Sequence, residues 1–344
     1  MNMPEAIAKV IAGEDLSHAE MLDVMGLIMN GEATHAQIGG FLVGLRVKGE
    51  TIDEIRAGAT VMRALATPVV TQRVNIVDTC GTGGSGSNKF NVSTASAFVA
   101  ASVGVAVAKH GSRGASSKSG SADLLEAAGA AIMLSPEQVG RCVDTVGVGF
   151  LFAMNHHSAM KHAIGPRRDM VVRTIFNLLG PLTNPAGAKR QLLGVYDKKW
   201  LRPLAEVLRA LGSEHVMVVH SDDGLDEISI AAATSVAELK EGEISEYRIE
   251  PGDFGLPIGS LDGLVVEDSA QSLELVQQAL EGTNTDATNI VAINAGAAIY
   301  LSGRVDSLAE GVELAQEAIS GGLASAKLAE FVAFTADLPV PPFA

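Results

Sequence analysis

Apolar residues in the N-terminal part of the chain recur at intervals of three and four positions, which is typical of amphipathic helices. Two such rows are Met21, Val24, Met25 and Ile28, and Ile38, Phe41, Leu42 and Leu45. Ser17, Thr34 and Thr51 each precede a glutamate or glutamine by three positions, the arrangement of a capping box at a helix start. The pattern predicts a helical domain over residues 1–70, closed by Pro68.

After residue 70, short apolar runs alternate with helical stretches. The predicted strands are 74–77, 103–108, 150–153, 191–195 and 215–220. Strands that alternate with helices along the chain favour an α/β fold with a central, mostly parallel sheet. Further runs at 228–230, 236–239 and 244–249 predict an antiparallel addition, and the pattern is helical from Ala270 onward. We therefore expect residues 71–344 to form one large α/β domain.

A glycine-rich loop follows the first predicted strand and leads into an alanine-rich helix. Its glycines at 81, 83, 84 and 86 let the backbone approach a ligand closely and adopt positive φ angles. Asn91, Ser93 and Thr94 then place polar groups at the start of the helix, where free N–H groups and the helix dipole favour an anion. The segment indicates a phosphate-binding loop, and a surface turn without a ligand stays open on this segment alone.

The loop matches known phosphate motifs only in part. A P-loop needs a lysine and then serine or threonine directly after its last glycine, and the chain has no such pair at that spacing. Gly81, Gly83 and Gly86 satisfy the dinucleotide pattern, but the stretch 101–108 lacks the acidic residue that would bind a ribose. Neither motif identifies the ligand.

A second loop, 109–121, follows the next predicted strand. Lysine, arginine, histidine and serine side chains are interleaved there with glycines, and no acid occurs before Asp123. A solvated charged surface does not require glycine and serine packed between cations. Ligands of open α/β sheets bind outside the carboxyl ends of the strands, where both loops are expected. Two adjacent anion-binding loops indicate a ligand with more than one phosphate.

Five motifs occur in order along the chain and carry a resemblance. They are the loop 81–94, Lys109-His110-Gly111-x-Arg113, Gly165-Pro166-Arg167-Arg168, the long motif 173–185, and Asp223-Gly224-Leu225-Asp226-Glu227. Together they resemble the anthranilate phosphoribosyltransferase family. The likeness extends from the N-terminal helices to about Thr335, and the motif 173–185 is long and specific.

The resemblance implies a fold, an activity and an assembly. The fold is that of the nucleoside phosphorylases and phosphoribosyltransferases, with the site in a cleft between a small helical and a large α/β domain. In the reaction, the amine of anthranilate displaces pyrophosphate from phosphoribosyl pyrophosphate, with Mg²⁺ as cofactor, in tryptophan biosynthesis. The family forms homodimers through the helical domain, which part of 166–186 is expected to join.

The resemblance also implies roles for individual residues. Phosphoribosyl pyrophosphate is expected at Gly81, Gly84, Ser85, Lys89, Asn91, Ser93, Thr94, Lys109, Ser117 and Ser121; anthranilate at Gly81, His110, Ser112, Arg167 and Pro181; and Mg²⁺ at Ser93, Asp226 and Glu227. Lys109 and Arg167 would act electrostatically, since the reaction depends on positioning and on stabilising the leaving charge. No catalytic triad is apparent.

Three positions depart from the family pattern. Ser85 stands where aspartate is usual, Lys89 where threonine is common, and Ser112 where asparagine is expected. The first change removes a carboxylate near a metal, which Lys89 is expected to offset by neutralising pyrophosphate. Ser112 leaves open a related transferase or nucleoside phosphorylase with another aromatic or heterocyclic acceptor. A catalytically silent homologue that binds nucleic acid is the other alternative.

Charge and cysteine usage narrow these alternatives. A formal net charge of −15 argues against nucleic acid or an anionic membrane as the main partner. Within this acidic chain, 161–173 holds four cations and one acid, which suits a small anionic substrate.

The two cysteines predict no disulfide framework and a reducing cytoplasm. No signal peptide or membrane span is expected. His156 and His157 lack a third ligand at zinc spacing, so packing roles are expected.

Overall fold

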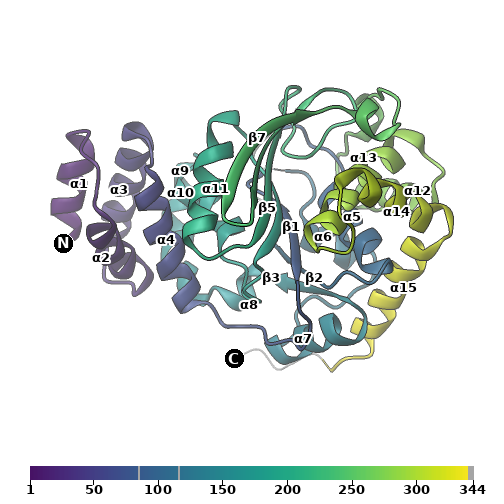
Figure 1. Ribbon diagram of the computed structural model, residues 1–344. Coiled ribbons are helices and arrows are strands. Elements are labelled where there is room, and N and C mark those ends of the chain that lie inside the picture. The colour runs from purple at the N-terminus through teal and green to yellow at the C-terminus, as the bar shows by residue number, and fades with distance from the viewer. Residues whose placement is uncertain (84–85, 115–116, 340–344) are drawn as a thin grey trace.

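The computed structural model describes residues 1–83, 86–114 and 117–339. The chain begins with a bundle of four helices, α1 (Met3–Ile11), α2 (His18–Met29), α3 (His35–Lys48) and α4 (Ile52–Leu65). The capping boxes predicted at Ser17, Thr34 and Thr51 are all formed. Figure 1 shows the bundle at one end of the molecule and helices α12–α15 at the other, with the sheet between them.

Two later helices complete the bundle. α9 (Lys161–Met170) contacts α2 and α3, and α10 (Ile175–Leu179) contacts α3 and α4. Ala163, Ile175 and Leu179 are fully buried in the same core as Phe41. The side chain of Leu179 lies 3.0 Å from where a Cβ on Gly58 would stand. This close contact explains the glycine in the middle of α4.

The large domain is built on a seven-stranded sheet of order β3-β2-β1-β4-β5-β6-β7. Its strands are β1 (Val77–Gly81), β2 (Val107–Gly111), β3 (Val148–Phe152), β4 (Arg190–Gly194), β5 (His215–Ser221), β6 (Thr234–Lys240) and β7 (Glu243–Ile249). The first five strands run parallel to one another, β6 pairs antiparallel with β5, and β7 pairs antiparallel with β6. The prediction of a mostly parallel sheet with an antiparallel addition is confirmed.

Helices cover both faces of the sheet. α5 (Val92–Ser102), α12 (Ser269–Glu281), α13 (Thr285–Leu301), α14 (Leu308–Ser320) and α15 (Leu323–Ala336) share one core, and α11 (Leu201–Ala210) packs with the N-terminal bundle on the other face. β5 shows the alternation that this requires, because Val216 and Val218 face one core while Met217 and Val219 face the other.

Shorter elements connect these layers. They are α6 (Ser121–Ala127), α7 (Pro136–Thr145), α8 (Ala153–His156), and the 3₁₀ helices η1 (Ser158–Met160), η2 (Gly180–Leu182), η3 (Lys198–Trp200), η4 (Pro251–Phe254) and η5 (Asp262–Leu264). Among the described residues, no helix is long and apolar enough to cross a bilayer.

Three predicted strands differ from the structure. β1 begins only at Val77, and Val74 is 80% exposed in the preceding segment. β2 begins at Val107 because α5 and its turn at Gly104 (φ 91°) occupy the residues before it. The run 228–230 is not a strand. Ile228 is buried, but its N–H donates to the Asn294 side chain (3.0 Å) instead of to a neighbouring strand.

Candidate functional site

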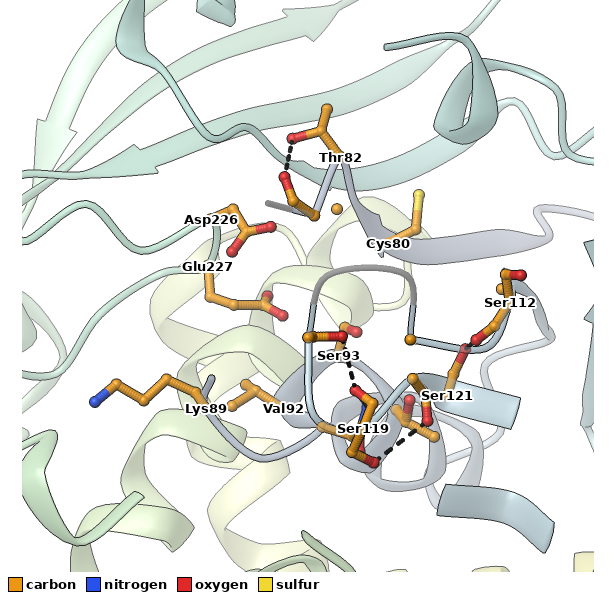
Figure 2. A pocket seen from close by; sticks show the side chains of 18 of the residues that line it. Cys80, Thr82, Lys89, Val92, Ser93, Ser112, Ser119, Ser121, Asp226 and Glu227 are labelled. Atoms are coloured by element: carbon orange, nitrogen blue, oxygen red, sulfur yellow. Dashed lines mark hydrogen bonds between the residues drawn. The ribbon is translucent and has the colours of Figure 1, made fainter. Parts of the chain in front are cut away.

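A cavity of 310 Å³ opens where β1 and β2 end and α5 begins. Both predicted loops line it, as expected for the carboxyl ends of adjacent parallel strands. Of the predicted site residues, Gly81, Lys89, Asn91, Ser93, Thr94, Lys109, His110, Ser112, Ser117, Ser121, Asp226 and Glu227 line this cavity. Figure 2 shows the Glu227 side chain pointing toward Ser93, with Asp226 beside it.

The segment carrying Asp226 crosses directly over the ends of two strands. A Cβ on Gly194 would lie 1.7 Å from the Asp226 carbonyl oxygen, and one on Gly81 would lie 2.9 Å from its carboxylate. The backbone contact at Gly194 is too short for any side chain, whereas at Gly81 only the Asp226 carboxylate would have to turn aside. The glycine at the end of β4 therefore lets the Asp226 backbone lie against the sheet, with its carboxylate at the cavity wall.

Lys109 extends from β2 beneath the first loop. Its ammonium donates to the Thr79 carbonyl (2.5 Å) and to the Ser93 hydroxyl (3.2 Å). Thr79 in turn donates its hydroxyl to the Ser93 carbonyl (2.9 Å). Burial lowers the pKa of Lys109, while the negative charges of Asp78 and Glu227 oppose that shift. The lysine thus supplies a positive charge at the start of α5.

Asp226 and Glu227 form a carboxylate pair opposite Lys109. Burial, and then the neighbouring Asp226 charge, raise the pKa of Glu227 to about 8. The Lys109 charge and a hydrogen bond from the Ser93 backbone act in the opposite direction. Two close carboxylates without a cation repel one another, so the site favours a positive ligand between them.

His110 is a neutral hydrogen-bond acceptor at the cavity. Burial, followed by the neighbouring His157 and His156, lowers its pKa well below the usual value, and the ring donates to the Gly180 backbone. The Nε2 atom is buried and has no partner among the described residues. Nδ1 is therefore the nitrogen that bonds to the Gly180 carbonyl, and it carries the proton because a carbonyl can only accept. The His157 ring packs against the His110 ring in a tilted arrangement, with the ring centroids 5.1 Å apart and an angle of 52° between the planes.

Asp123 organises the second loop. Its carboxylate accepts hydrogen bonds from the Gly114 and Gly120 N–H groups, both at 2.9 Å. Arg113 also lines the cavity, where its charge is balanced by ion pairs with Asp123 (3.1 Å) and Glu126. A Cβ on Gly120 would lie 2.2 Å from the Gly114 nitrogen. The loop is therefore folded back on itself and presents Ser112, Ser117 and Ser121 to the cavity.

Several predicted site residues stand apart from this cavity. Arg167 and Pro181 are not among its described lining residues. The Arg167 guanidinium lies over the Phe176 ring at 5.1 Å, and the described part of the chain gives it no carboxylate partner. The Pro181 carbonyl accepts from Gln191 (2.7 Å). Gly84 and Ser85 lie outside the described residues.

Lys89 differs from its expected role. Its ammonium donates to the Leu261 carbonyl (2.8 Å), and Figure 2 shows it pointing away from Ser93 and Glu227. In this arrangement the charge lies at the edge of the site. The expectation that Lys89 faces the pyrophosphate is therefore not met by the geometry.

Further polar residues line the cavity without having been predicted as site residues, namely Thr82, Ser87, Asn88, Arg113, Ser119 and Asn177. Ser119 belongs to the second loop and was not distinguished from its neighbouring serines. Asn177 lies inside the long motif 173–185, but its side chain accepts from the Thr174 N–H (3.0 Å) as a helix cap. A polar residue that already caps a helix cannot be recognised as a site residue from the sequence alone.

Comparisons with known proteins agree with this geometry. A family model described as the helical bundle domain of a glycosyl transferase family matches residues 4–66, and the model of its a/b domain matches 73–325. An anthranilate phosphoribosyltransferase of Marinomonas sp. is 62% identical over 337 residues, covering 97% of each chain. That of Thioalkalivibrio sulfidiphilus is 60% identical and covers 98% of this chain and 99% of the relative.

Solved structures show the same relation. The crystal structure of anthranilate phosphoribosyltransferase from Thermus thermophilus aligns with a TM-score of 0.90 and 42% identity, over 96% of this chain and 99% of that one. The Saccharomyces cerevisiae enzyme in complex with phosphoribosyl pyrophosphate and Mg aligns with a TM-score of 0.88 and 26% identity, over 98% of each. With both domain models matched and relatives this similar over nearly its whole length, the chain belongs to the anthranilate phosphoribosyltransferase family.

Proposed function

We propose that this chain transfers the phosphoribosyl group of phosphoribosyl pyrophosphate to the amine of anthranilate and releases pyrophosphate. The observation that carries the proposal is the joint cavity of the two loops, with Lys109 on one side and the Asp226–Glu227 pair on the other. In the reaction the bond from the anomeric carbon to pyrophosphate breaks, a carbon–nitrogen bond forms, and the amine loses one proton.

The loops are proposed to bind the donor and stabilise its leaving charge. The α5 N-terminus, the Lys109 ammonium and the serines of the second loop offer donors to the pyrophosphate oxygens. The Thr94 hydroxyl is buried and lacks a partner among the described residues. An unsatisfied buried hydroxyl is costly, and a phosphate oxygen would satisfy it.

Mg²⁺ fits the residues present. Burial beside the Asp226 charge raises the pKa of Glu227 to about 8, and a divalent cation would relieve this repulsion. Asp226, Glu227 and the Ser93 hydroxyl are the proposed oxygen ligands, the type that Mg²⁺ prefers. When bound, Mg²⁺ neutralises charge on the pyrophosphate. The yeast relative was solved with Mg and phosphoribosyl pyrophosphate, which supports the assignment.

Anthranilate is proposed to lie beside Gly81, His110 and Ser112. The His110 Nε2 lone pair would accept an N–H of the arylamine, because its tautomer leaves that atom free to accept. Arg167 is proposed to bind the carboxylate, because the described residues give its guanidinium no carboxylate partner and a guanidinium suits a carboxylate best. Pro181 would form an apolar wall. A yeast relative was solved with 4-fluoroanthranilate.

A fluorescence assay tests this function. Anthranilate fluorescence should fall only when phosphoribosyl pyrophosphate and Mg²⁺ are both present. The alternative acceptor that Ser112 left open would instead give donor binding without heat from anthranilate in a calorimetric titration. The nucleic-acid alternative is opposed by the net charge of −15 and would require salt-sensitive retention on single-stranded DNA without turnover of any amine.

We also propose an assembly and a location. Residues 1–70, joined by part of 166–186, would form the dimer interface of a homodimer, and 71–344 would be the catalytic domain. Val43, Val47 and Ile11 support this, because they are apolar and exposed on α1 and α3. The unpaired Cys80 and Cys142 support a reducing, cytoplasmic location. Sedimentation of the Val47→Lys variant as a monomer would agree with the dimer.

A further inference from the structure

A serine far along the chain reaches the first phosphate loop. Ser272, in the first turn of α12, is fully buried and donates its hydroxyl to the Asn91 side-chain oxygen (2.7 Å). The same hydroxyl accepts the Asn91 backbone N–H (3.1 Å). One buried side chain thus satisfies two polar groups of a residue 181 positions away.

These contacts fix the orientation of the Asn91 amide. Its oxygen accepts from Ser272 and from the Ser119 hydroxyl (2.8 Å), and its nitrogen donates to the Ser119 carbonyl (3.3 Å). The Ser119 carbonyl can only accept, so the amide atom that faces it is the nitrogen, and the atom that contacts both hydroxyls is the oxygen. Asn91 therefore joins α12, the first loop and the second loop at one point, directly before Ser93 and Thr94.

The backbone around Asn91 is anchored on the same C-terminal region. The Phe90 N–H donates to the Leu264 carbonyl (3.0 Å), and the Val266 N–H donates to the Asn88 carbonyl (2.9 Å). Residues 88–91 are thus paired along the segment that leads into α12. The hydrogen bonds between Ser272 and Asn91 connect α12 in the same way to a side chain that lines the cavity.

We propose that Ser272 is a positioning residue for the phosphoribosyl donor, acting through Asn91. The inference rests on the proposed function, because it takes Asn91 as a donor-binding residue. Without the hydroxyl, the Asn91 N–H loses its partner, and the side-chain oxygen keeps only the Ser119 hydroxyl, so the amide is held in place less firmly. If the Asn91 amide has to be oriented during binding, phosphoribosyl pyrophosphate binds more weakly. The binding of anthranilate is not affected.

Kinetics of Ser272→Ala test the proposal. The KM for phosphoribosyl pyrophosphate should rise about fivefold to tenfold, as expected for losing a buried hydrogen bond, while the KM for anthranilate stays unchanged. Ser272→Thr, which keeps a hydroxyl, should restore most of the affinity. Ser269→Ala is the matched control, because Ser269 is on the same helix and no hydrogen bond to its hydroxyl occurs within the described residues. Equal rises in both KM values, or an unchanged donor KM, would overturn the inference.

Calorimetry separates this inference from the proposed function. Titration with phosphoribosyl pyrophosphate and Mg²⁺ should show weaker binding to Ser272→Ala than to the wild type, even if anthranilate proves not to be the acceptor. In Asn91→Ala, adding Ser272→Ala should have little further effect, since the two residues act through one contact. Additive losses in the double variant would show that Ser272 acts elsewhere, and a wild type that binds no donor would refute both proposals.

Discussion

The two halves of the candidate site are built differently. The donor side consists of strand ends, a helix start and two loops whose polar groups contact each other, with Asn91 and Lys109 each making several hydrogen bonds. The acceptor side combines His110 and Ser112 of the cavity with Arg167 and Pro181, which do not line it. Arg167 lies on α9, which packs on the N-terminal bundle. The donor side is formed by the sheet and its loops. The acceptor side also depends on how the helical bundle packs against the sheet.

The largest expected effect concerns the donor side. Lys109→Met should lower kcat/KM for phosphoribosyl pyrophosphate about a hundredfold, because charged hydrogen bonds to pyrophosphate are lost. Thermal stability should also fall, since the buried Asp78 and Glu227 lose the opposing charge and the Thr79 carbonyl loses its donor. Steady-state kinetics and a melting curve check both. Lys118→Met is the control, because Lys118 is exposed and pairs with Glu267 at 3.4 Å; a similar loss there would point to general charge effects.

On the acceptor side, Arg167→Lys should raise the KM for anthranilate about tenfold. Lysine keeps the charge but not the planar pair of donors that binds a carboxylate. The KM for phosphoribosyl pyrophosphate should be unaffected. Arg168→Lys serves as the control, because the neighbouring side chain is 78% exposed. Unchanged kinetics for Arg167→Lys and for Arg167→Ala would remove the carboxylate contact from the proposal.

The carboxylate pair predicts a pH dependence of stability without metal. Glu227 titrates at about 8 when folded against 4.5 unfolded, so the folded state binds more protons between these values. Unfolding free energy should therefore fall as pH rises from about 4.5 to 8, and the change should be complete above that range. Glu227→Gln should flatten this slope. Melting temperatures of both proteins, in chelator, measure it, and parallel profiles would show that Glu227 does not titrate there.

The smallest effect is expected at Ser112. Ser112→Asn, which restores the residue expected by family resemblance, should lower the KM for anthranilate about twofold to fivefold, because an amide adds one hydrogen bond. The donor KM should not change. A rise in the anthranilate KM would indicate that this chain has adapted its acceptor pocket to serine.

Much of the donor side could be predicted from the sequence. Gly81, Asn91, Ser93 and Lys109 follow strand patterns that fix their place in a parallel sheet, so topology brings them together. The role of Ser272 could not be predicted, because it depends on a helix packed from 181 residues away. The absence of a strand at 228–230 also escaped prediction, since apolar burial alone does not distinguish a strand from a buried loop.

The crossing of the Asp226 segment over Gly194 has a consequence for how this enzyme can change. A single methyl group on Gly194 would meet a carbonyl oxygen at 1.7 Å, and relief would come only by lifting the acidic segment off the sheet. The hydrophobic layers beneath would be untouched. Gly194→Ala is therefore expected to displace the proposed Mg²⁺ ligands while leaving the core packed.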